Sequence, residues 1–127
     1  MSGGAPERLR LPVDRRLRRK SEFEAVYARG RRFGDSFFAV VTCANDTGGP
    51  RLGLAVAAKT AGNSVERNRI RRIVRESFRL RQHDIPSVDL VVSARARVRG
   101  AAGSELRASL DALWNRVKEQ CASSRHS

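Results

Sequence analysis

The sequence has few of the residues on which most metal sites and enzyme active sites depend. Its 127 residues include only two cysteines and two histidines. Cys43 and Cys121 have neither C-x-x-C spacing nor paired histidines, so we predict two buried thiols and no zinc site or disulfide framework. His126 lies next to the last residue, which leaves His83 as the sole candidate for a histidine base. Histidine and cysteine chemistry is therefore not expected.

Catalytic sequence motifs are also missing. The chain has no phosphate loop, no H-E-x-x-H, no G-x-S-x-G and no D-x-D pair to hold catalytic magnesium. We therefore predict no catalytic residue and no metal ligand in the protein itself. It also has no apolar run of about 18 residues to cross a membrane and no apolar stretch typical of a signal peptide. These absences predict a cytoplasmic protein without a membrane partner.

Acidic residues are scarce relative to basic ones. The chain carries 26 lysines and arginines against 13 acidic residues, a formal charge of +13. Such an excess is typical of proteins that bind nucleic acid. The length suits one domain. We predict a flexible basic arm at residues 1–20, a single RNA-binding domain at residues 21–121 and a disordered tail at residues 122–127.

The basic residues gather on one predicted helix. Asn63 and Glu66 form a capping box, so the helix should begin near Ser64, and it should continue to about Arg81. At about 100° per residue, one side is apolar and the opposite side is basic without an interspersed carboxylate. The apolar side holds Ile70, Ile73, Val74, Ser77 and Phe78, and the basic side holds Asn68, Arg71, Arg72, Arg75 and Arg79. Such a face indicates an anionic partner.

A short helix with two aromatic residues is predicted before the strands. Ser21 and Glu24 form a second capping box, and Gly30 ends the helix. Phe23, Val26 and Tyr27 share one face of it. The two aromatic side chains either anchor the helix on a sheet or stack on bases, and both interpretations stay open.

The remaining elements indicate a mixed fold. Residues 37–43 and 52–56 read as a hairpin-like strand pair, and residues 88–93 as a buried strand. A last helix starts at Ser104. Its predicted core stripe is Leu106, Leu110, Leu113, Trp114, Val117 and Cys121, and Arg95, Arg97 and Arg99 form a second exposed basic stretch before it. This order favours an open sheet with helices on one face.

Charge, aromatic residues and a sheet together predict a module that binds RNA through phosphates and unstacked bases. One alternative is a non-enzymatic ribosomal or structured-RNA-binding protein. A second alternative, a regulator of double-stranded DNA, lacks a helix-turn-helix and a dimer interface, so no DNA partner is expected.

Four segments of the chain resemble the protein subunit of bacterial ribonuclease P, over residues 14–118. The most specific is the arginine-rich run RNRIRRIVRE at residues 67–76. Supporting it are RRKSEFEAVYARG at residues 18–30, LGLAV at residues 52–56, and the strand opened by Asp89 and followed by Arg95. Many members carry two adjacent lysines where this chain has Ala58 and Lys59.

The resemblance implies an α+β fold of the ribosomal protein S5 domain 2-like kind. It is an α-β-β-β-α-β-α two-layer sandwich with a four-stranded mixed sheet, a left-handed βαβ crossover and a short first strand near Arg32 and Phe33. The left-handed crossover departs from the usual right-handed rule.

The resemblance also implies an endoribonuclease holoenzyme that removes the 5′ leader of precursor tRNA. Its partners would be ribonuclease P RNA and precursor tRNA, with the catalytic centre and essential Mg²⁺ in the RNA subunit. The implied leader cleft is lined by Phe23 and Tyr27 with Phe38 nearby. Implied RNA-binding residues are Asn68, Arg71 and Arg75 toward the leader, Arg67, Arg69 and Arg72 toward the RNA subunit, and Lys59 at a phosphate.

Overall fold

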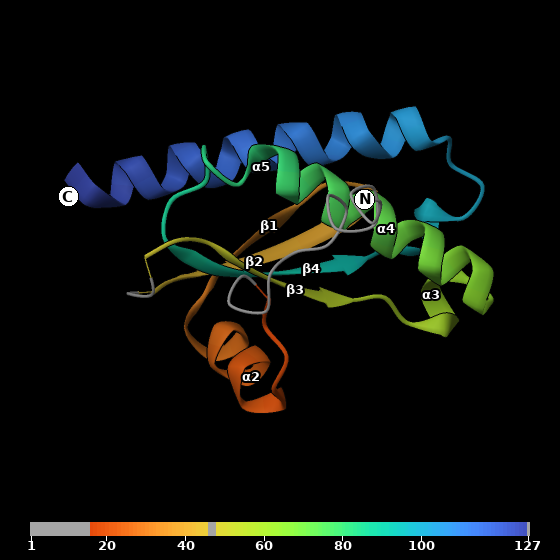
Figure 1. Cartoon of the computed structure of the whole chain (residues 1–127), viewed down its shortest axis with the longest axis horizontal. Coiled ribbons are helices and arrows are strands. Elements are labelled where there is room, and N and C mark those ends of the chain that lie inside the picture. The colour runs from red at the N-terminus through yellow and green to blue at the C-terminus, as the bar shows by residue number, and fades with distance from the viewer. Residues whose placement is uncertain (1–15, 46–47, 127) are drawn as a thin grey trace, which may run out of the picture.

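The computed structural model describes residues 16–45 and 48–126, with backbone alone for residues 121–126. Figure 1 shows the elements in chain order. They are α2 (Lys20–Arg29), β1 (Arg31–Gly34), β2 (Phe38–Ala44), β3 (Arg51–Ala55), α3 (Ala58–Ala61), α4 (Ser64–Arg81), β4 (Val88–Ala94), the 3₁₀ helix η2 (Ala96–Val98) and α5 (Gly103–His126). Apart from the short α3 and η2, this is the predicted α-β-β-β-α-β-α order, and β1 lies where the resemblance placed it.

The strands form one mixed sheet in the order β1-β2-β4-β3. Strand β4 is antiparallel to β2 and parallel to β3, and β1 is antiparallel to β2. The predicted hairpin of residues 37–43 with residues 52–56 is therefore wrong, because β4 lies between β2 and β3. The connection from β3 to β4 through α4 is the βαβ unit for which the resemblance implies a left-handed crossover. The four-stranded mixed sheet and the α+β class are confirmed.

Helices cover both faces of the sheet, so the prediction of helices on one face alone is wrong. Val40 and Val92 belong to the core beneath α4 and α5, whereas Val41 and Val91 belong to a smaller cluster beneath α2. Figure 1 shows α4 and α5 on one side and α2 on the other. The apolar runs in β2 and β4 explain this, because strands buried on both faces lose polar alternation.

The main core joins α4 and α5 to the sheet. All five residues of the predicted apolar side of α4 are buried, and so is the α5 stripe as far as Val117. Trp114 Nε1 donates to Ser77 Oγ at 2.8 Å, which satisfies both buried polar groups. The Phe78 and Trp114 rings meet edge to face, with centroids 5.8 Å apart. This packing fixes α4 on the sheet. The side chain of Cys121 lies outside the described residues.

Two predicted helix starts have different outcomes. Asn63 Oδ1 accepts from the Glu66 N–H at 3.0 Å, which confirms the start of α4 at Ser64. The predicted Ser21 cap of α2 is wrong. Helix α2 begins at Lys20, and Glu22 Oε1 accepts from the backbone N–H groups of Arg18 and Arg19 at 2.9 and 3.0 Å. A glutamate inside the first turn therefore takes the place of a serine cap.

Gly30 ends α2 as predicted, for a steric reason. Its N–H donates to the Val26 carbonyl, and its φ of −80° is ordinary. A Cβ at this position would lie 2.5 Å from both the Val26 oxygen and Val41 Cγ1. Only glycine lets the chain pass this closely between α2 and the sheet.

The described structure extends beyond residues 21–121 at both ends. Residues 16–20 belong to the fold, because Leu17 is 5% exposed and its N–H donates to the Leu52 carbonyl at 2.9 Å. At the other end α5 remains helical to His126, where a disordered tail was predicted. The first 15 residues of the predicted basic arm lie outside the described residues.

Candidate nucleic-acid interface

The exposed side of α4 carries several guanidinium groups that have no acidic partner in the described part of the chain. Glu66 pairs with Arg69 at 3.2 Å, and Glu76 pairs with Arg107 of α5 at 3.4 Å. Within residues 16–45 and 48–126, no ion pair reaches the other arginines of the predicted interface, Arg67, Arg71, Arg72 and Arg75. The predicted basic face is thus confirmed as a geometric feature, and its charge is available to an anion.

Arg69 is the exception among these arginines. Besides its ion pair with Glu66, its Nη2 donates to the Ala101 carbonyl at 2.6 Å. Ala101 lies just before α5. The side chain therefore braces α4 against the start of α5, and much of its hydrogen-bonding capacity is used within the protein.

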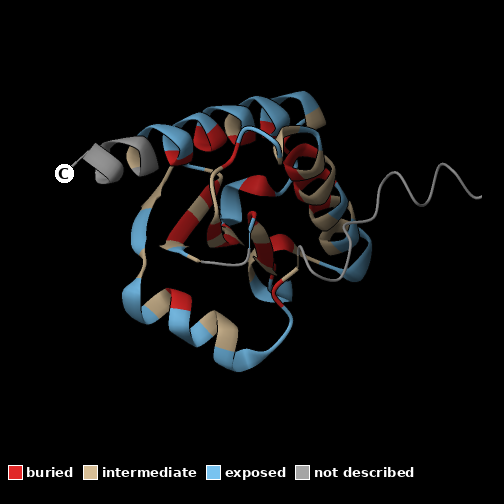
Figure 2. Ribbon diagram, turned by 60° about the vertical axis from the view of Figure 1, so that its left-hand side comes forward, coloured by how far each residue is buried: buried red, intermediate tan, exposed pale blue. Residues whose placement is uncertain are grey.

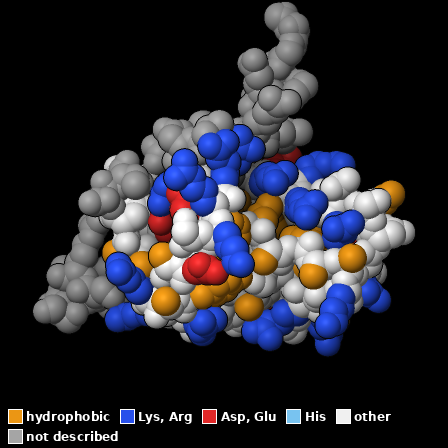
Figure 3. Space-filling view, turned by 90° about the horizontal axis from the view of Figure 1, so that it is seen from below, with side chains coloured by type: hydrophobic (Ala, Val, Ile, Leu, Met, Phe, Trp, Pro, Cys, Tyr) orange, Lys and Arg blue, Asp and Glu red, His pale blue; other side chains and the backbone are white. Residues whose placement is uncertain are grey.

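A cleft of about 220 Å³ lies at the outer edge of β3, between the start of α2 and the middle of α4. Figure 3 looks onto the face that carries α2, where hydrophobic side chains are surrounded by lysines and arginines. The cleft combines apolar and cationic groups. Its lining residues are Arg16, Leu17, Arg18, Phe23, Leu52, Leu54, Arg71 and Arg75.

The electrostatics of the cleft favour a bound anion. Burial, followed by the like charges of Arg71 and Arg16, lowers the pKa of the Arg75 guanidinium from its usual value. Arg16 Nε is buried and, within the described part of the chain, has no hydrogen-bond partner. None of the described lining residues is acidic. A ligand with oxygen acceptors would give the buried Arg16 Nε a hydrogen-bond partner, and its negative charge would offset the repulsion among the guanidinium groups.

Phe23 forms the aromatic part of the cleft. Its ring lies against Gly53 of β3, so closely that a Cβ on Gly53 would be 2.8 Å from Phe23 Cζ. The ring is half-buried and also packs on the cluster beneath α2. Both interpretations of this aromatic residue, the anchor and the stacking surface, are thus compatible with its position.

The other two predicted cleft aromatics lie elsewhere. Tyr27 follows one turn later on α2, where Arg32 lies over its ring at 5.7 Å from the centroid. Tyr27 is not among the residues that line the cleft. Phe38 is fully buried in the core beneath α4 and α5, to which the cleft residue Leu52 also belongs, and it is not among the residues that line the cleft. That Phe38 lies near the leader stays a prediction.

Lys59 lies on the short helix α3, away from the cleft. Its own carbonyl and that of Thr60 each accept from the Arg99 guanidinium at 2.9 Å. Arg99, predicted as part of an exposed basic stretch, therefore holds α3 in place. The side chain of Lys59 is exposed.

Five cleft residues were missed by the sequence interpretation: Arg16, Leu17, Arg18, Leu52 and Leu54. The first three lie in the segment predicted as a flexible arm, and the other two were identified only as strand residues. Arg16 forms a parallel bridge with Leu52. Nothing in the local sequence signals this pairing, because it joins segments 36 residues apart.

Among the residues that the structure describes, no group of three or more His, Cys, Asp or Glu side chains is placed to hold a metal ion. None of the described helices has the length and apolar character needed to cross a bilayer.

Comparisons with known proteins agree with these features. A family model described as Ribonuclease P matches residues 11–118. The ribonuclease P protein component of Escherichia coli O157:H7 is 40% identical over 109 residues, which are 86% of this chain and 92% of that protein. The component from Shigella boydii serotype 18 has the same identity and coverage.

Solved structures with the same fold come from two further bacteria. The RNase P protein of Staphylococcus aureus superposes with a TM-score of 0.78 at 30% identity, over 82% of this chain and 95% of that one. The RNase P protein from Thermotoga maritima gives a TM-score of 0.73 at 30% identity, over 80% and 96% of the two chains. Sequence similarity and fold similarity thus identify the same group of proteins.

Proposed function

This chain belongs to the Ribonuclease P family, and on that premise we propose that its cleft binds the single-stranded 5′ leader of precursor tRNA. As a protein component of ribonuclease P, the chain binds the RNA subunit and takes part in the removal of the leader that produces the mature tRNA 5′ end. The holoenzyme is thus an endoribonuclease. The residues that contact the RNA subunit and those that contact precursor tRNA are proposed below.

The cleft between α2 and α4 carries the proposal. Arg71 and Arg75, which have no acidic partner among the described residues, supply positive charge on one side, and Phe23 supplies an aromatic ring on the other. A single strand presents phosphates along its backbone and exposed base faces, which match these two chemistries. Duplex RNA would bury its bases and leave the apolar part of the cleft unused. The combination therefore favours a single-stranded segment.

The outer side of α4 is proposed to bind the RNA subunit. Arg72 is exposed, Arg67 is half-buried with its Nε unpaired within the described residues, and both lack acidic partners there. Asn68, grouped with Arg71 and Arg75 toward the leader, accepts through its Oδ1 from Arg71 at 3.5 Å. Lys59 would add a phosphate contact beyond the helix start. Arg69 is assigned a bracing role as well, because it already contacts Glu66 and Ala101.

The catalytic centre is proposed to lie in the RNA subunit, with Mg²⁺ held by RNA and substrate. The residues of the cleft do not fit a magnesium site, since Mg²⁺ prefers carboxylate and other oxygen ligands and the charged groups lining the cleft are guanidinium groups. The protein's contribution is to lower the repulsion between two polyanions and to favour leader-bearing tRNA. We place this activity in the cytoplasm.

Reconstitution tests the assignment. The full chain is combined with a bacterial ribonuclease P RNA at low Mg²⁺ and supplied with precursor tRNA. We expect cleavage at the mature 5′ end to be faster than with the RNA alone. Cleavage that persists after complete removal of RNA would contradict the catalytic role of the RNA subunit. Binding of structured RNA without any stimulation would favour the alternative, a non-enzymatic RNA-binding module.

Phe23→Ala tests the cleft itself. Loss of one stacking ring costs about 1 to 3 kcal/mol per base, so the affinity of the holoenzyme for precursor tRNA should fall while that for mature tRNA should not. Phe33→Ala is the matched control, because Phe33 is a half-buried phenylalanine like Phe23 but lies on β1 and does not line the cleft. Equal losses for precursor and mature tRNA would mean that Phe23 serves only as a packing anchor.

A further inference from the structure

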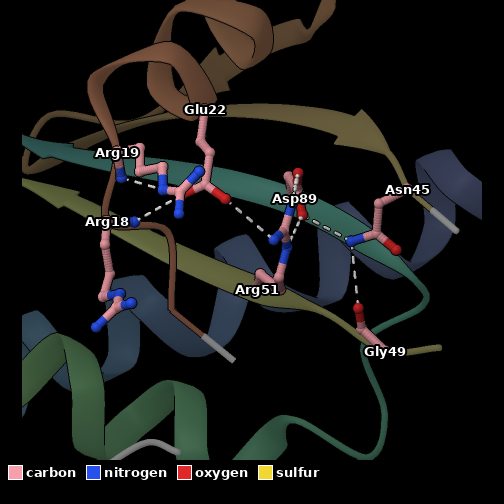
Figure 4. Close-up of polar contacts among 7 residues, drawn as sticks. All are labelled: Arg18, Arg19, Glu22, Asn45, Gly49, Arg51 and Asp89. Atoms are coloured by element: carbon pink, nitrogen blue, oxygen red, sulfur yellow. Dashed lines mark hydrogen bonds and ion pairs between the residues drawn. The ribbon is translucent and has the colours of Figure 1, made fainter. Parts of the chain in front are cut away.

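An ion network joins the first turn of α2 to the edge strand β3 and its neighbour β4 (Figure 4). Arg51 of β3 forms a bidentate contact with Asp89 of β4, with Nε to Oδ1 at 2.8 Å and Nη2 to Oδ2 at 2.7 Å. Its remaining nitrogen, Nη1, lies 3.2 Å from Glu22 Oε2. The register places Arg51 directly beside Asp89. One guanidinium therefore connects β3, β4 and α2.

The network also determines where the chain enters α2. The second oxygen of Glu22 accepts from the backbone N–H groups of Arg18 and Arg19. Arg18 and Phe23 both line the cleft, and they lie on either side of Glu22 in sequence. The contacts therefore run from the centre of the sheet, through Arg51 and Glu22, to the backbone that carries one wall of the cleft.

Besides this network, the wall is held by the bond from the Leu17 N–H to the Leu52 carbonyl and by the packing of Phe23 on the cluster beneath α2. Val26 is the only residue of α2 that is buried. Figure 2 shows α2 exposed along most of its length, in contrast to the sheet. Asp89 has the additional support of Asn45 Nδ2 at 2.7 Å, so the sheet end of the network is fixed. A helix with so little buried surface depends on its polar attachment for its position.

Arg51 differs from the arginines of the cleft in having its charge compensated. Two carboxylates contact its guanidinium, and its side chain is 21% exposed. It is not among the residues that line the cleft. An arginine held in this way by two carboxylates is a poor candidate for a direct phosphate contact.

We propose that Arg51 is a positioning residue for leader binding: through Glu22 it holds the Arg18 and Phe23 wall at the distance from α4 that admits one RNA strand. The inference rests on the proposed function of the cleft. It assigns the selection of leader-bearing tRNA partly to a residue that does not contact RNA. Removing Arg51 should leave both walls chemically intact but loosen the spacing between them.

Arg51→Met in the reconstituted holoenzyme tests the proposal. The quantity measured is the ratio of the dissociation constants for mature and precursor tRNA. We expect this ratio to fall about three- to tenfold, because the variant loses hydrogen bonds between charged groups. The affinity of the protein for the RNA subunit and the salt dependence of precursor binding should match the wild type. Arg51→Lys, which keeps the charge but not the planar fork, should give an intermediate ratio.

Arg81→Met is the matched control. Arg81 also contacts two carboxylates, those of Asp84 and Asp111, and its side chain is 24% exposed, but it lies at the far end of α4. Its loss should leave the tRNA ratio unchanged. If Arg51→Met lowers the affinity for mature tRNA and for the RNA subunit as much as for precursor, Arg51 serves stability alone. A smaller salt slope for the variant would instead indicate a direct phosphate contact. Either result overturns the proposal.

Two further outcomes separate this inference from the proposed function. If the wild-type holoenzyme does not prefer precursor over mature tRNA, the function proposed for the cleft fails. If the wild type shows the preference and Arg51→Met retains it, the cleft stands and the inference fails. Should Arg51→Met not fold, Arg51→Lys carries the test alone, and an unchanged ratio in that variant overturns the proposal.

Discussion

Helices α2 and α4 face each other across the cleft, but the rest of the protein holds them in different ways. Helix α4 buries five side chains in the main core and is braced to α5 by the Glu76 and Arg107 pair. Helix α2 buries only Val26 and relies on the polar network around Arg51. The cationic wall of the cleft therefore belongs to a helix embedded in the main core, whereas the aromatic wall belongs to a helix with one fully buried side chain.

This difference suits the two tasks proposed for the walls. Phosphate charges repeat regularly along any RNA, so guanidinium groups on a fixed helix can meet them without rearrangement. Bases of a leader differ in size and in the orientation of their rings. A lightly attached aromatic wall can adjust to them at small energetic cost, and the attachment limits how far it moves.

The largest expected effect comes from truncating one buried side chain in each of the two helices, α4 and α2. Phe78→Ala in α4 should lower the free energy of unfolding by about 3 to 5 kcal/mol. Val26→Ala in α2 removes two methyl groups, each worth about 0.8 kcal/mol, and should cost about 1 to 2 kcal/mol. Urea denaturation of the protein alone measures both. Equal losses would mean that the two walls are equally integrated in the core.

The sequence was sufficient for α4 because one residue pattern determines both of its sides. The Asn63 cap, the buried side and the charged side follow from a period of about 3.6 residues. The sheet was harder to predict. In a continuous apolar run such as FFAVVTC, both faces are buried, so hydrophobicity does not show which alternate residues face which helix.

Long-range pairings account for the other differences between prediction and structure. The insertion of β4 between β2 and β3, and the bridge between Arg16 and Leu52, depend on contacts between distant segments. Local turn residues at 45–50 favoured a hairpin, but the apolar β4 buries more surface at the centre of the sheet. The Arg51 network was missed for the same reason: its three charged residues are far apart in sequence.

The positive charge of α4 should contribute directly to the affinity for precursor tRNA. Arg71→Ala should weaken binding of precursor tRNA by about 1 kcal/mol or more and reduce the slope of log K against log salt by about 0.7 to 0.9 for the lost contact. Titrations at several salt concentrations measure the slope. Arg107→Ala is the control, because Arg107 is exposed on α5 and is paired with Glu76. A slope that Arg71→Ala leaves unaltered would remove Arg71 from the phosphate contacts.

The smallest expected effect concerns Glu22, which attaches α2 to the sheet. Its contribution to protein stability should depend on pH. Backbone N–H groups of Arg19 and Arg18, and then the Arg51 charge, lower the pKa of Glu22 below its usual 4.5. Because the folded-state pKa is the lower one, ionised Glu22 stabilises the protein in full above pH 4.5 and loses this effect as the pH falls through the folded-state value.

Glu22→Gln isolates this contribution from the other carboxylates. At pH 6 the variant should be less stable than the wild type by about 1 kcal/mol or less, as is usual for a cap or a partly exposed ion pair. The difference should shrink as the pH falls below 4.5, because the wild type then loses the same charge. Thermal unfolding of both proteins across this range measures it. A gap that stays constant down to pH 2 would mean that the carboxylate charge does not hold α2, and the aromatic wall would then depend on Val26 and its neighbours alone.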